Sequence, residues 1–330
     1  MPAFLGIDVA KDTLAVALLG PKSPRKTSVP NTPAGYARLV QWLTNQHVSD
    51  VTVCLEATGT YSDDVALALH DAHYRVFLVN PARIAAYAKS QLARTKTDPA
   101  DAVLIARYAH AEAASLTPYS PPDPALRELR GLVRHLDALQ LQRQAELNRQ
   151  AAGGHPSAVA EALAAHIAFL DKQIAETLRQ ISDHLEGHPE LGKQHELLQS
   201  IVGIGSITAS RILAEAGDLT RFRDARAVAA YAGLTPRQYS SGTSVQRRTR
   251  LSKIGNASLR RALFFPAIVA KQHNPVLQAF CARLAERGLA PKAIVGAAMR
   301  KLLQLAYGVL ASGRPFDAAL GLAHMTPKRA

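Results

Sequence analysis

The sequence predicts three parts: an α/β domain, a long helical arm and a second domain built only from helices. Short apolar runs alternate with amphipathic segments in the first part, and leucine and isoleucine then recur at three- and four-residue spacing. The remainder is rich in Ala and Arg, with almost no strand pattern. A proline cluster at 118–124 marks the first boundary. We therefore expect domains at residues 1–117, 118–196 and 197–330.

The first part contains an ordered series of predicted strands and helices. Apolar runs predict strands at 4–9, 13–19, about 27–29, 51–56 and 74–79. Amphipathic segments predict helices at 33–45, 62–71 and 81–92. Pro99 favours a first helical turn, so Asp98 is expected at the N-cap of a further helix. Three strands followed by alternating helices and strands form a mixed sheet wrapped by helices, the ribonuclease-H-like arrangement.

The second part is expected to be a hairpin of two long helices. Leu126–Arg149 and Ala158–Leu185 carry the helical spacing, and Gly153-Gly154-His155-Pro156 separates them. Such an antiparallel or coiled-coil arm usually serves packing or oligomerisation. From about Gln199 onward the pattern predicts short helices.

Composition excludes several classes of protein. Of the 330 residues, 48% are apolar and 20% are charged, which is typical of globular chains. Two cysteines in no metal-binding spacing exclude a disulfide scaffold and a zinc finger. We find no secretion signal and no apolar run long enough for a membrane span, so we expect a soluble protein without membrane contact.

Positive charge is concentrated towards the end of the chain. Residues 201–330 hold 20 Lys and Arg against 5 Asp and Glu, whereas residues 1–200 hold 19 against 21. This segregation favours a polyanion, most simply nucleic acid, as the partner of the basic part. A basic surface that serves solubility alone is the alternative.

Four carboxylates stand in settings that are unusual for structural acids: Asp8, Glu56, Asp98 and Asp101. Asp8 lies within an apolar strand, where an unpaired charge is costly. Glu56 ends a second such strand, at the edge where ligands collect in α/β sheets. Asp98 and Asp101 are three residues apart on one helical turn. The alternative is ordinary capping of turns and helix starts by Asp.

All-oxygen ligands of this kind suit Mg²⁺ or Mn²⁺, which can activate a phosphodiester. We therefore expect the four acids to converge on a divalent metal ion. The histidines show no metal-binding spacing, and no Walker or dinucleotide glycine motif is present.

The basic part offers two candidate contacts to nucleic acid. Ile201–Ser206 resembles a helix-hairpin-helix turn, in which Gly203 and Gly205 let backbone amides approach a phosphate. A tight helix connection is the alternative. A cationic run around Gly255 is expected to form two helix ends and a loop. The full set of expected contacts is Lys96, Gly203, Gly205, Arg237, Arg247, Arg248, Arg250, Lys253, Arg260 and Arg261.

Residues 233–244 are expected to form a loop that carries neighbouring serines, Ser240 and Ser241. Residue chemistry alone suggests turn formation or hydrogen bonding to phosphate. A nucleophilic serine needs an activating group, and nothing local in the sequence supplies a base.

Taken together, these motifs resemble the DEDD-type insertion-sequence transposases, the bridge-RNA-guided serine recombinases, over nearly the whole chain. The motifs that carry the resemblance are Gly6–Lys11, Glu56–Tyr61, Lys96–Asp98 with Asp101, Gly203–Gly205, and Ala232–Arg237 leading into Ser241-Gly242. The resemblance implies a RuvC-like domain whose four acids bind Mg²⁺, and a helical domain whose Ser241 attacks DNA and forms a phosphoserine link. It further implies donor and target DNA, a structured guide RNA, a homodimer that assembles to a tetramer, and a bacterial, cytoplasmic, nucleoid-associated location.

Two other functions remain open from the sequence. A RuvC-like, structure-selective endonuclease would use the four acids with water as the nucleophile. A non-catalytic nucleic-acid-binding protein would need neither metal nor serine.

Overall fold

The chain folds into two compact units, Met1–Pro121 and Pro122–Ala330. The structure, a computed structural model, describes residues 3–20, 23–48, 50–57, 59–94, 97–241 and 245–323. The predicted helical arm belongs to the second unit.

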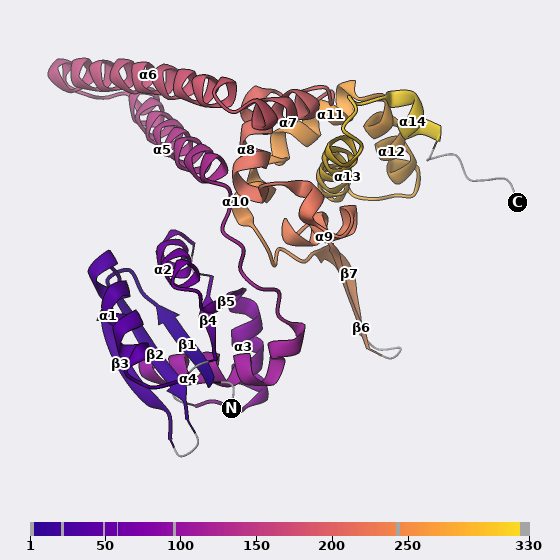
Figure 1. Ribbon diagram of the computed structural model, residues 1–330. Coiled ribbons are helices and arrows are strands. Elements are labelled where there is room, and N and C mark those ends of the chain that lie inside the picture. Colours follow the sequence, from indigo (N-terminus) through magenta and orange to yellow (C-terminus); the bar gives the residue numbers. More distant parts are fainter. Residues whose placement is uncertain are drawn as a thin grey trace, which may run out of the picture. The chain divides into compact units, whose positions relative to one another are not determined.

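The first unit is built on a five-stranded sheet of order β3-β2-β1-β4-β5 (Figure 1). The strands are β1 (Ala3–Val9), β2 (Thr13–Leu19), β3 (Arg25–Pro30), β4 (Val51–Glu56) and β5 (Arg75–Val79). β2 is antiparallel to both β1 and β3, whereas β1, β4 and β5 run parallel. The predicted mixed sheet is therefore confirmed, and β1 lies at its centre.

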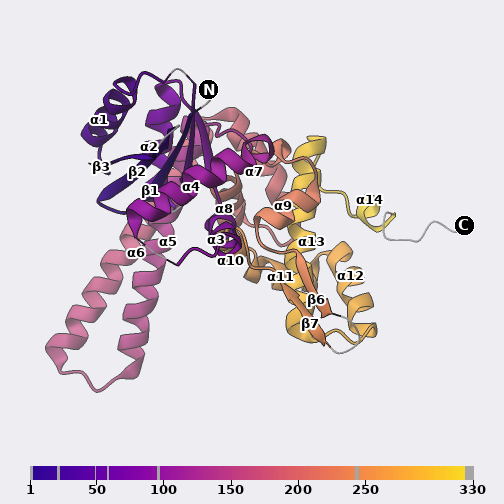
Figure 2. The same cartoon turned by 90° about the horizontal axis from the view of Figure 1, so that it is seen from below.

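Helices cover both faces of this sheet. They are α1 (Pro33–Thr44), α2 (Thr60–Asp71), α3 (Pro81–Ser90) and α4 (Asp98–Glu112), with a short turn of 3₁₀ helix at Ala113–Ser115. Leu5 and Ile7 of β1 belong to the core shared with α1 and α2. Phe4 points to the opposite face, where it packs with α4. Figure 2 shows α4 lying across the strands, with α1 on the other side of the sheet.

The start of α4 differs from the prediction. Thr97 has the extended backbone of an N-cap residue, and its carbonyl accepts hydrogen bonds from the N–H groups of Ala100 and Asp101. Asp98 is therefore the first helical residue rather than the N-cap. Pro99 still occupies the first turn, where its missing N–H costs nothing, so the helix begins one residue earlier than predicted.

Two long helices begin the second unit. α5 (Pro124–Ala152) and α6 (Ser157–Glu186) lie side by side as a hairpin (Figure 2), and the positive φ angles of Gly153 and Gly154 turn the chain between them. Leucine and isoleucine side chains at helical spacing fill the seam between the two helices. Both helices were expected from the sequence.

The rest of the second unit is a cluster of helices packed around α13. Its elements are α7 (Pro189–Gln199), α8 (Ser206–Ala216), η2 (Leu219–Arg221), α9 (Ala225–Tyr231), α10 (Ala257–Ala262), α11 (Phe264–His273), α12 (Pro275–Glu286), α13 (Pro291–Ser312) and α14 (Ala318–Ala323). Among the described residues, α13 is the one helix long and apolar enough to cross a membrane. Half of its most apolar window is buried by neighbouring parts of the protein, as for the core helix of a globular domain.

A β-hairpin interrupts this helical cluster, so the prediction of an all-α final domain is wrong. β6 (Pro236–Ser241) pairs antiparallel with β7 (Val245–Leu251). The loop expected at 233–244 and the helix ends expected in the cationic run both fall partly on these strands. No strand pattern is visible in this segment, because arginine and glutamine, rather than apolar residues, fill much of the hairpin.

A buried ionic network ties α5 to the helical cluster. Glu215, with a side chain only 6% exposed, accepts hydrogen bonds from Arg134 Nε at 3.1 Å and from Asn256 Nδ2 at 3.0 Å. These two bonds lower the pKa of Glu215, although burial opposes them. Arg211 forms a second connection, because its Nε donates to Asp137 at 2.9 Å.

Candidate active site

The four acids expected to bind metal line one cavity of the first unit, of about 910 Å³. Three elements supply them: β1 carries Asp8, β4 ends at Glu56, and the first turn of α4 holds Asp98 and Asp101. The structure thus brings together residues that are up to 93 positions apart in the chain.

Strand register places the first two acids next to each other. Ile7 of β1 pairs with Leu55 of the parallel strand β4, so the following residues, Asp8 and Glu56, occupy neighbouring positions. Both side chains point to the face opposite the Leu5 and Ile7 core, as alternation along a strand requires.

A close approach between α4 and the sheet positions the other two acids. Gly6 lies two residues before Asp8 on the same face, and a Cβ at Gly6 would lie 2.1 Å from the backbone oxygen of Ala102. Small side chains, Ala15 and Ala17, continue this contact on β2. Because α4 packs directly against the backbone of β1, its first turn reaches the cavity that Asp8 enters.

Burial and the neighbouring acids both disfavour ionisation of Asp8. The pKa of Asp8 is raised from 3.8 to about 6, first by burial and then by the negative charges of the other three acids. A hydrogen bond from the N–H of Val9 opposes this rise. A carboxyl group that resists ionisation beside three others is typical of a site that takes up a cation.

The chemistry of the donor set fits a divalent metal ion, because all four groups are hard oxygen ligands. Across the described ranges of the chain, however, no three acidic, histidine or cysteine side chains stand close enough to hold one ion without moving. Metal binding would therefore require the acidic side chains to draw together.

A rim of basic residues around the acids was not anticipated from the sequence. Lys26, Lys89, Arg94 and Arg107 also line the cavity, and all four are exposed. No local pattern could have identified them, because they come from β3, α3, the segment after α3 and α4. Acids surrounded by cations suit a metal ion together with the phosphates of a nucleic acid.

Ser241 lies in the second unit, at the end of β6. Its backbone pairs with that of Val245, and Ser240 pairs with Gln246. The side chains of both serines are outside the described residues, as are those of Arg247 and Arg248 and the whole of Lys96. Their expected roles therefore remain predictions.

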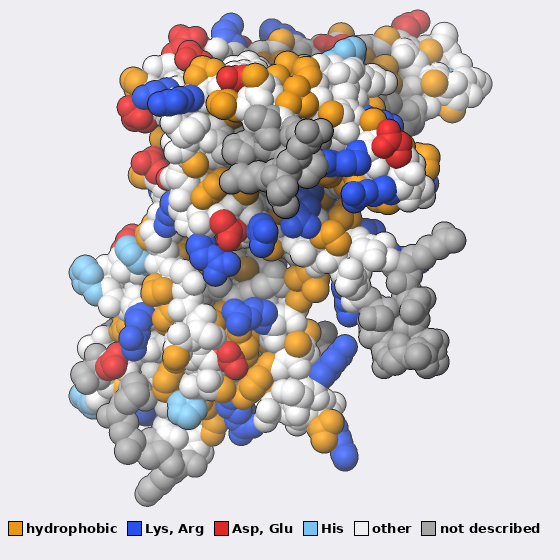
Figure 3. Space-filling model, turned by 90° about the vertical axis from the view of Figure 1, so that its right-hand side faces the viewer, with side chains coloured by type: hydrophobic (Ala, Val, Ile, Leu, Met, Phe, Trp, Pro, Cys, Tyr) orange, Lys and Arg blue, Asp and Glu red, His pale blue; other side chains and the backbone are white. Residues whose placement is uncertain are grey.

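The described part of the hairpin carries an unusual pair of cations. Arg237 of β6 is directly opposite Arg250 of β7, and both side chains are exposed. Like charges in directly opposed positions destabilise a sheet, so this arrangement favours a bound polyanion. Figure 3 shows Lys and Arg side chains at many points on one face of the molecule.

The base of the hairpin is held by hydrogen bonds to backbone. Arg260 donates from Nη1 to the carbonyl oxygens of Ala232 at 3.0 Å and Lys253 at 3.2 Å. Lys253 adopts a positive φ of 59°, rare for a lysine, and its N–H donates to Gly233. Arg260 therefore braces the chain on both sides of the hairpin, and a nucleic-acid contact by it remains a prediction.

The glycine turn expected to contact phosphate connects α7 to α8. Gly203 has a positive φ of 105°, and Gly205 is the N-cap of α8, with no side-chain hydrogen bond to the first turn. Backbone amides at the start of a helix attract anions, so this geometry is compatible with phosphate binding by the turn, which remains a prediction.

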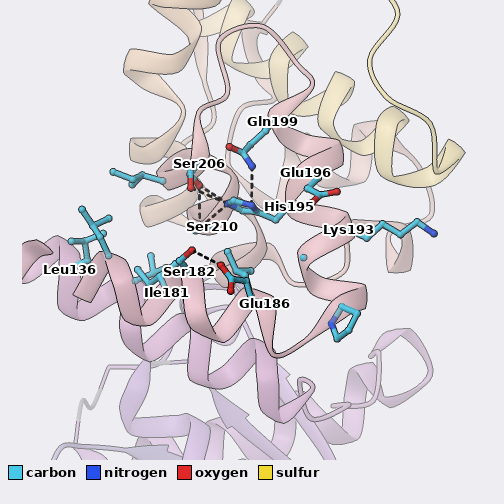
Figure 4. A pocket seen from close by; sticks show the side chains of 16 residues that line it. Leu136, Ile181, Ser182, Glu186, Lys193, His195, Glu196, Gln199, Ser206 and Ser210 are labelled. Atoms are coloured by element: carbon cyan, nitrogen blue, oxygen red, sulfur yellow. Dashed lines mark hydrogen bonds between the residues drawn. The ribbon is translucent and has the colours of Figure 1, made fainter. Parts of the chain in front are cut away.

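A separate cavity of about 500 Å³ lies between α6, α7 and α8 (Figure 4). His195 Nε2 is 3.2 Å from Ser210 Oγ, a pairing that could suggest an activated serine. The same Nε2 is 3.0 Å from the carbonyl oxygen of Ser206, which can only accept a hydrogen bond, so Nε2 carries the proton. Gln199 Nε2 donates to Nδ1, and the histidine is therefore not a base for Ser210.

Two family models match the chain. The model described as "Transposase IS116/IS110/IS902 family" matches residues 195–282. The DEDD transposase model of IS110, described as "Transposase", matches residues 5–152, which contain the four acids.

Whole-chain relatives are known as well. The chain is 34% identical to the "Pilin gene-inverting protein" of Moraxella bovis over 95% of this chain and 97% of that protein. The protein of the same name from Moraxella lacunata is also 34% identical, with the same coverage. A solved structure, "T. thermophilus RuvC in complex with Holliday junction substrate", matches 36% of this chain and 100% of its own, with 15% identity and a TM-score of 0.29. A likeness that weak carries no argument here.

Proposed function

Because the chain belongs to the IS116/IS110/IS902 family of transposases, and is thus a DNA transposase or recombinase, we propose that it cuts and rejoins donor and target DNA through a phosphoserine intermediate. The observation that carries this proposal is the convergence of four carboxylates on one cavity, where burial and then the three neighbouring acids raise the pKa of Asp8 to about 6.

The four acids would hold a divalent ion, Mg²⁺ or Mn²⁺. When bound, that ion would polarise the scissile phosphodiester and stabilise the charge on the departing oxygen. Asp8 must lose its proton to serve as a ligand, which its raised pKa allows at neutral pH. The basic rim of Lys26, Lys89, Arg94 and Arg107 would hold the DNA backbone over the acids.

Ser241 would act as the nucleophile. Its hydroxyl oxygen would form a bond to phosphorus as the bond to the sugar oxygen breaks, and the serine proton would pass to that departing oxygen. Rejoining would reverse these steps with the new strand. Arg237 and Arg250, opposed on the same hairpin, would hold the phosphates that flank the serine.

The partners of the reaction rest on the family resemblance. We propose that a structured guide RNA selects the donor and target sequences, and that dimers assemble to a tetramer in which the acids of one protomer serve the serine of another. The excess of positive charge over residues 201–330 supports binding to polyanions. DNA chemistry would place the protein in the bacterial cytoplasm, at the nucleoid.

A denaturing gel tests the mechanism. Purified protein, guide RNA, Mg²⁺ and labelled nicked DNA should yield a protein-linked strand, and Ser241→Ala should abolish this adduct while RNA binding persists. Ser240→Ala is the matched control and should retain the adduct. Asp101→Asn should remove cleavage that depends on metal. Free DNA ends without an adduct would instead identify a nuclease that uses water.

Inversion of a DNA segment is a second candidate function. Two relatives that match 95% of this chain are named for gene inversion rather than for transposition. A plasmid that carries two recognition sites in opposite orientation would distinguish the functions, because an inverting enzyme flips the segment between the sites without loss of DNA.

A further inference from the structure

A groove of about 570 Å³ lies in the second unit, between the Gly203 turn and α11. Its lining includes three exposed apolar side chains: Phe265 is 73% exposed, Val269 46% and Val202 42%. Phe265 and Val269 are four residues apart and share one face of α11. Contiguous exposed apolar surface of this kind usually marks a binding site.

The groove is preformed rather than a chance opening between mobile parts. A Cβ at Gly203 would lie 2.5 Å from Cβ of Ala270, so the turn packs directly on α11. Asn274, which is fully buried, donates from Nδ2 to the carbonyl oxygen of Val202 at 3.0 Å. Its Oδ1 also accepts from the N–H of Val276 and so caps α12. The apolar wall is therefore fixed to two helices.

Positive charge accompanies the apolar wall. Arg211 and Arg261 line the groove, and its described lining contains no acidic side chain. Arg211 is bonded to Asp137, which neutralises much of its charge. Arg261 is exposed, with Nη2 a long 3.4 Å from Ser258 Oγ, so its guanidinium can reach a ligand at little cost.

We propose that this groove binds unpaired nucleotides of a DNA strand, with a base stacked on Phe265 and a phosphate near Arg261. In a duplex the faces of the bases are covered by neighbouring bases, so the ring of Phe265 cannot stack on them. An unpaired nucleotide presents a flat apolar face and an anion together, which matches the apolar wall and the arginine. The inference rests on the proposed function, because cutting and exchanging strands exposes unpaired nucleotides.

A second copy of the chain fits the groove less well. A stable protein interface buries about 800 Å² on each partner, with an apolar centre. Three exposed apolar side chains in a groove lined by arginine offer less apolar surface and more positive charge than such an interface needs.

Binding of the full-length protein to three labelled probes tests the inference: a single-stranded DNA oligonucleotide, its duplex, and the same strand with abasic sites in place of bases. Phe265→Ala should weaken binding of the single strand about thirtyfold, the middle of the range for a lost base–aromatic stack. Binding of the duplex and the abasic strand should stay unchanged. Phe169→Ala, which removes a ring that is 56% exposed on α6, is the matched control and should affect no probe.

A fluorescent reporter gives an independent readout. The chain contains one tryptophan, so Phe265→Trp and Phe169→Trp each add a single new signal. The single strand should quench the new signal of Phe265→Trp and leave that of Phe169→Trp unchanged, because stacking requires contact with the ring.

Several outcomes would overturn the inference. Equal loss of binding to the normal and abasic strands would show that stacking plays no part. Tighter, Phe265-dependent binding of an RNA strand than of the same DNA would assign the groove to RNA. A lower molar mass of Phe265→Ala than of the parent protein in light scattering, with unchanged DNA binding, would assign the groove to a second copy of the chain. An absent serine adduct in the parent protein would refute the proposed function alone, because the Phe265 comparison does not require cleavage.

Discussion

Replacement of Asp8 by Asn should stabilise the metal-free protein at high pH. The pKa of Asp8 is about 6 in the folded protein against 3.8 for an unperturbed Asp. This difference corresponds to about 3 kcal/mol between the protonated and ionised forms. Ionised Asp8 therefore destabilises the fold by at most about this amount, since the partly accessible side chain is also screened by water.

The sign of the pH dependence follows from the raised pKa. Between about pH 4 and pH 6 the folded protein retains a proton on Asp8 that the unfolded chain has lost. Stability from this residue is thus fully present below the unfolded pKa and is lost as the pH rises through 6. Asp8→Asn should raise the free energy of unfolding by up to about 3 kcal/mol at pH 8 and by almost nothing at pH 4.

Urea unfolding in the presence of EDTA, followed by tryptophan fluorescence, measures this effect. Trp42 is the one tryptophan of the chain and packs against the core of the first unit, so its signal reports on the unit that contains Asp8. Asp12→Asn, an exposed acid between β1 and β2, is the matched control and should change stability by less than about 0.5 kcal/mol.

Mg²⁺ should make the parent protein more stable than Asp8→Asn, the reverse of their order without metal. Metal that binds the folded state stabilises the parent protein, whereas Asp8→Asn removes a ligand and should lose most of that gain. The reasoning would be refuted if Asp8→Asn were no more stable than the parent at pH 8 without metal, or if its gain were the same at pH 4.

Three further predictions concern residues that support the two units. Gly6→Val should cost at least about 3 kcal/mol and abolish metal binding, because its side chain would collide with α4 at Ala102; Trp42 fluorescence and calorimetric titration with Mn²⁺ check this. Glu215→Ala should destabilise the second unit by roughly 2–3 kcal/mol in calorimetric unfolding, since it leaves Arg134 and Asn256 without their carboxylate, while Glu215→Gln should cost less. Burial lowers the pKa of His195, so stability from this residue is present above the unfolded pKa and declines as the pH falls below about 6.5. Replacing His195 with Gln should flatten that decline in calorimetric scans from pH 7 to pH 5, and an unchanged slope would contradict it.

The sequence by itself determined the elements of the first unit and the identity of its acids. Short, nearly continuous apolar runs specify β1, β2 and β4, and the two faces of each strand follow from its two-residue period. Asp8 and Glu56 were recognisable because each places a charge within an otherwise buried pattern. Pro99 located the start of α4 to within one residue, since proline is favoured in the first turn of a helix and disfavoured in its interior.

Only the tertiary structure decided what surrounds these acids. The basic rim comes from β3, α3, the segment after it and α4, and no local pattern joins residues so far apart in the chain. The hairpin that carries Ser241 was also hidden, because arginine and glutamine fill much of its sequence, whereas backbone pairing and the hydrogen bonds of Arg260 at its base hold it in the folded protein. Local periodicity reports how a segment buries its own side chains. It does not report which distant cations, backbone oxygens or helix starts come into contact in the folded chain, and the candidate site is built from those contacts.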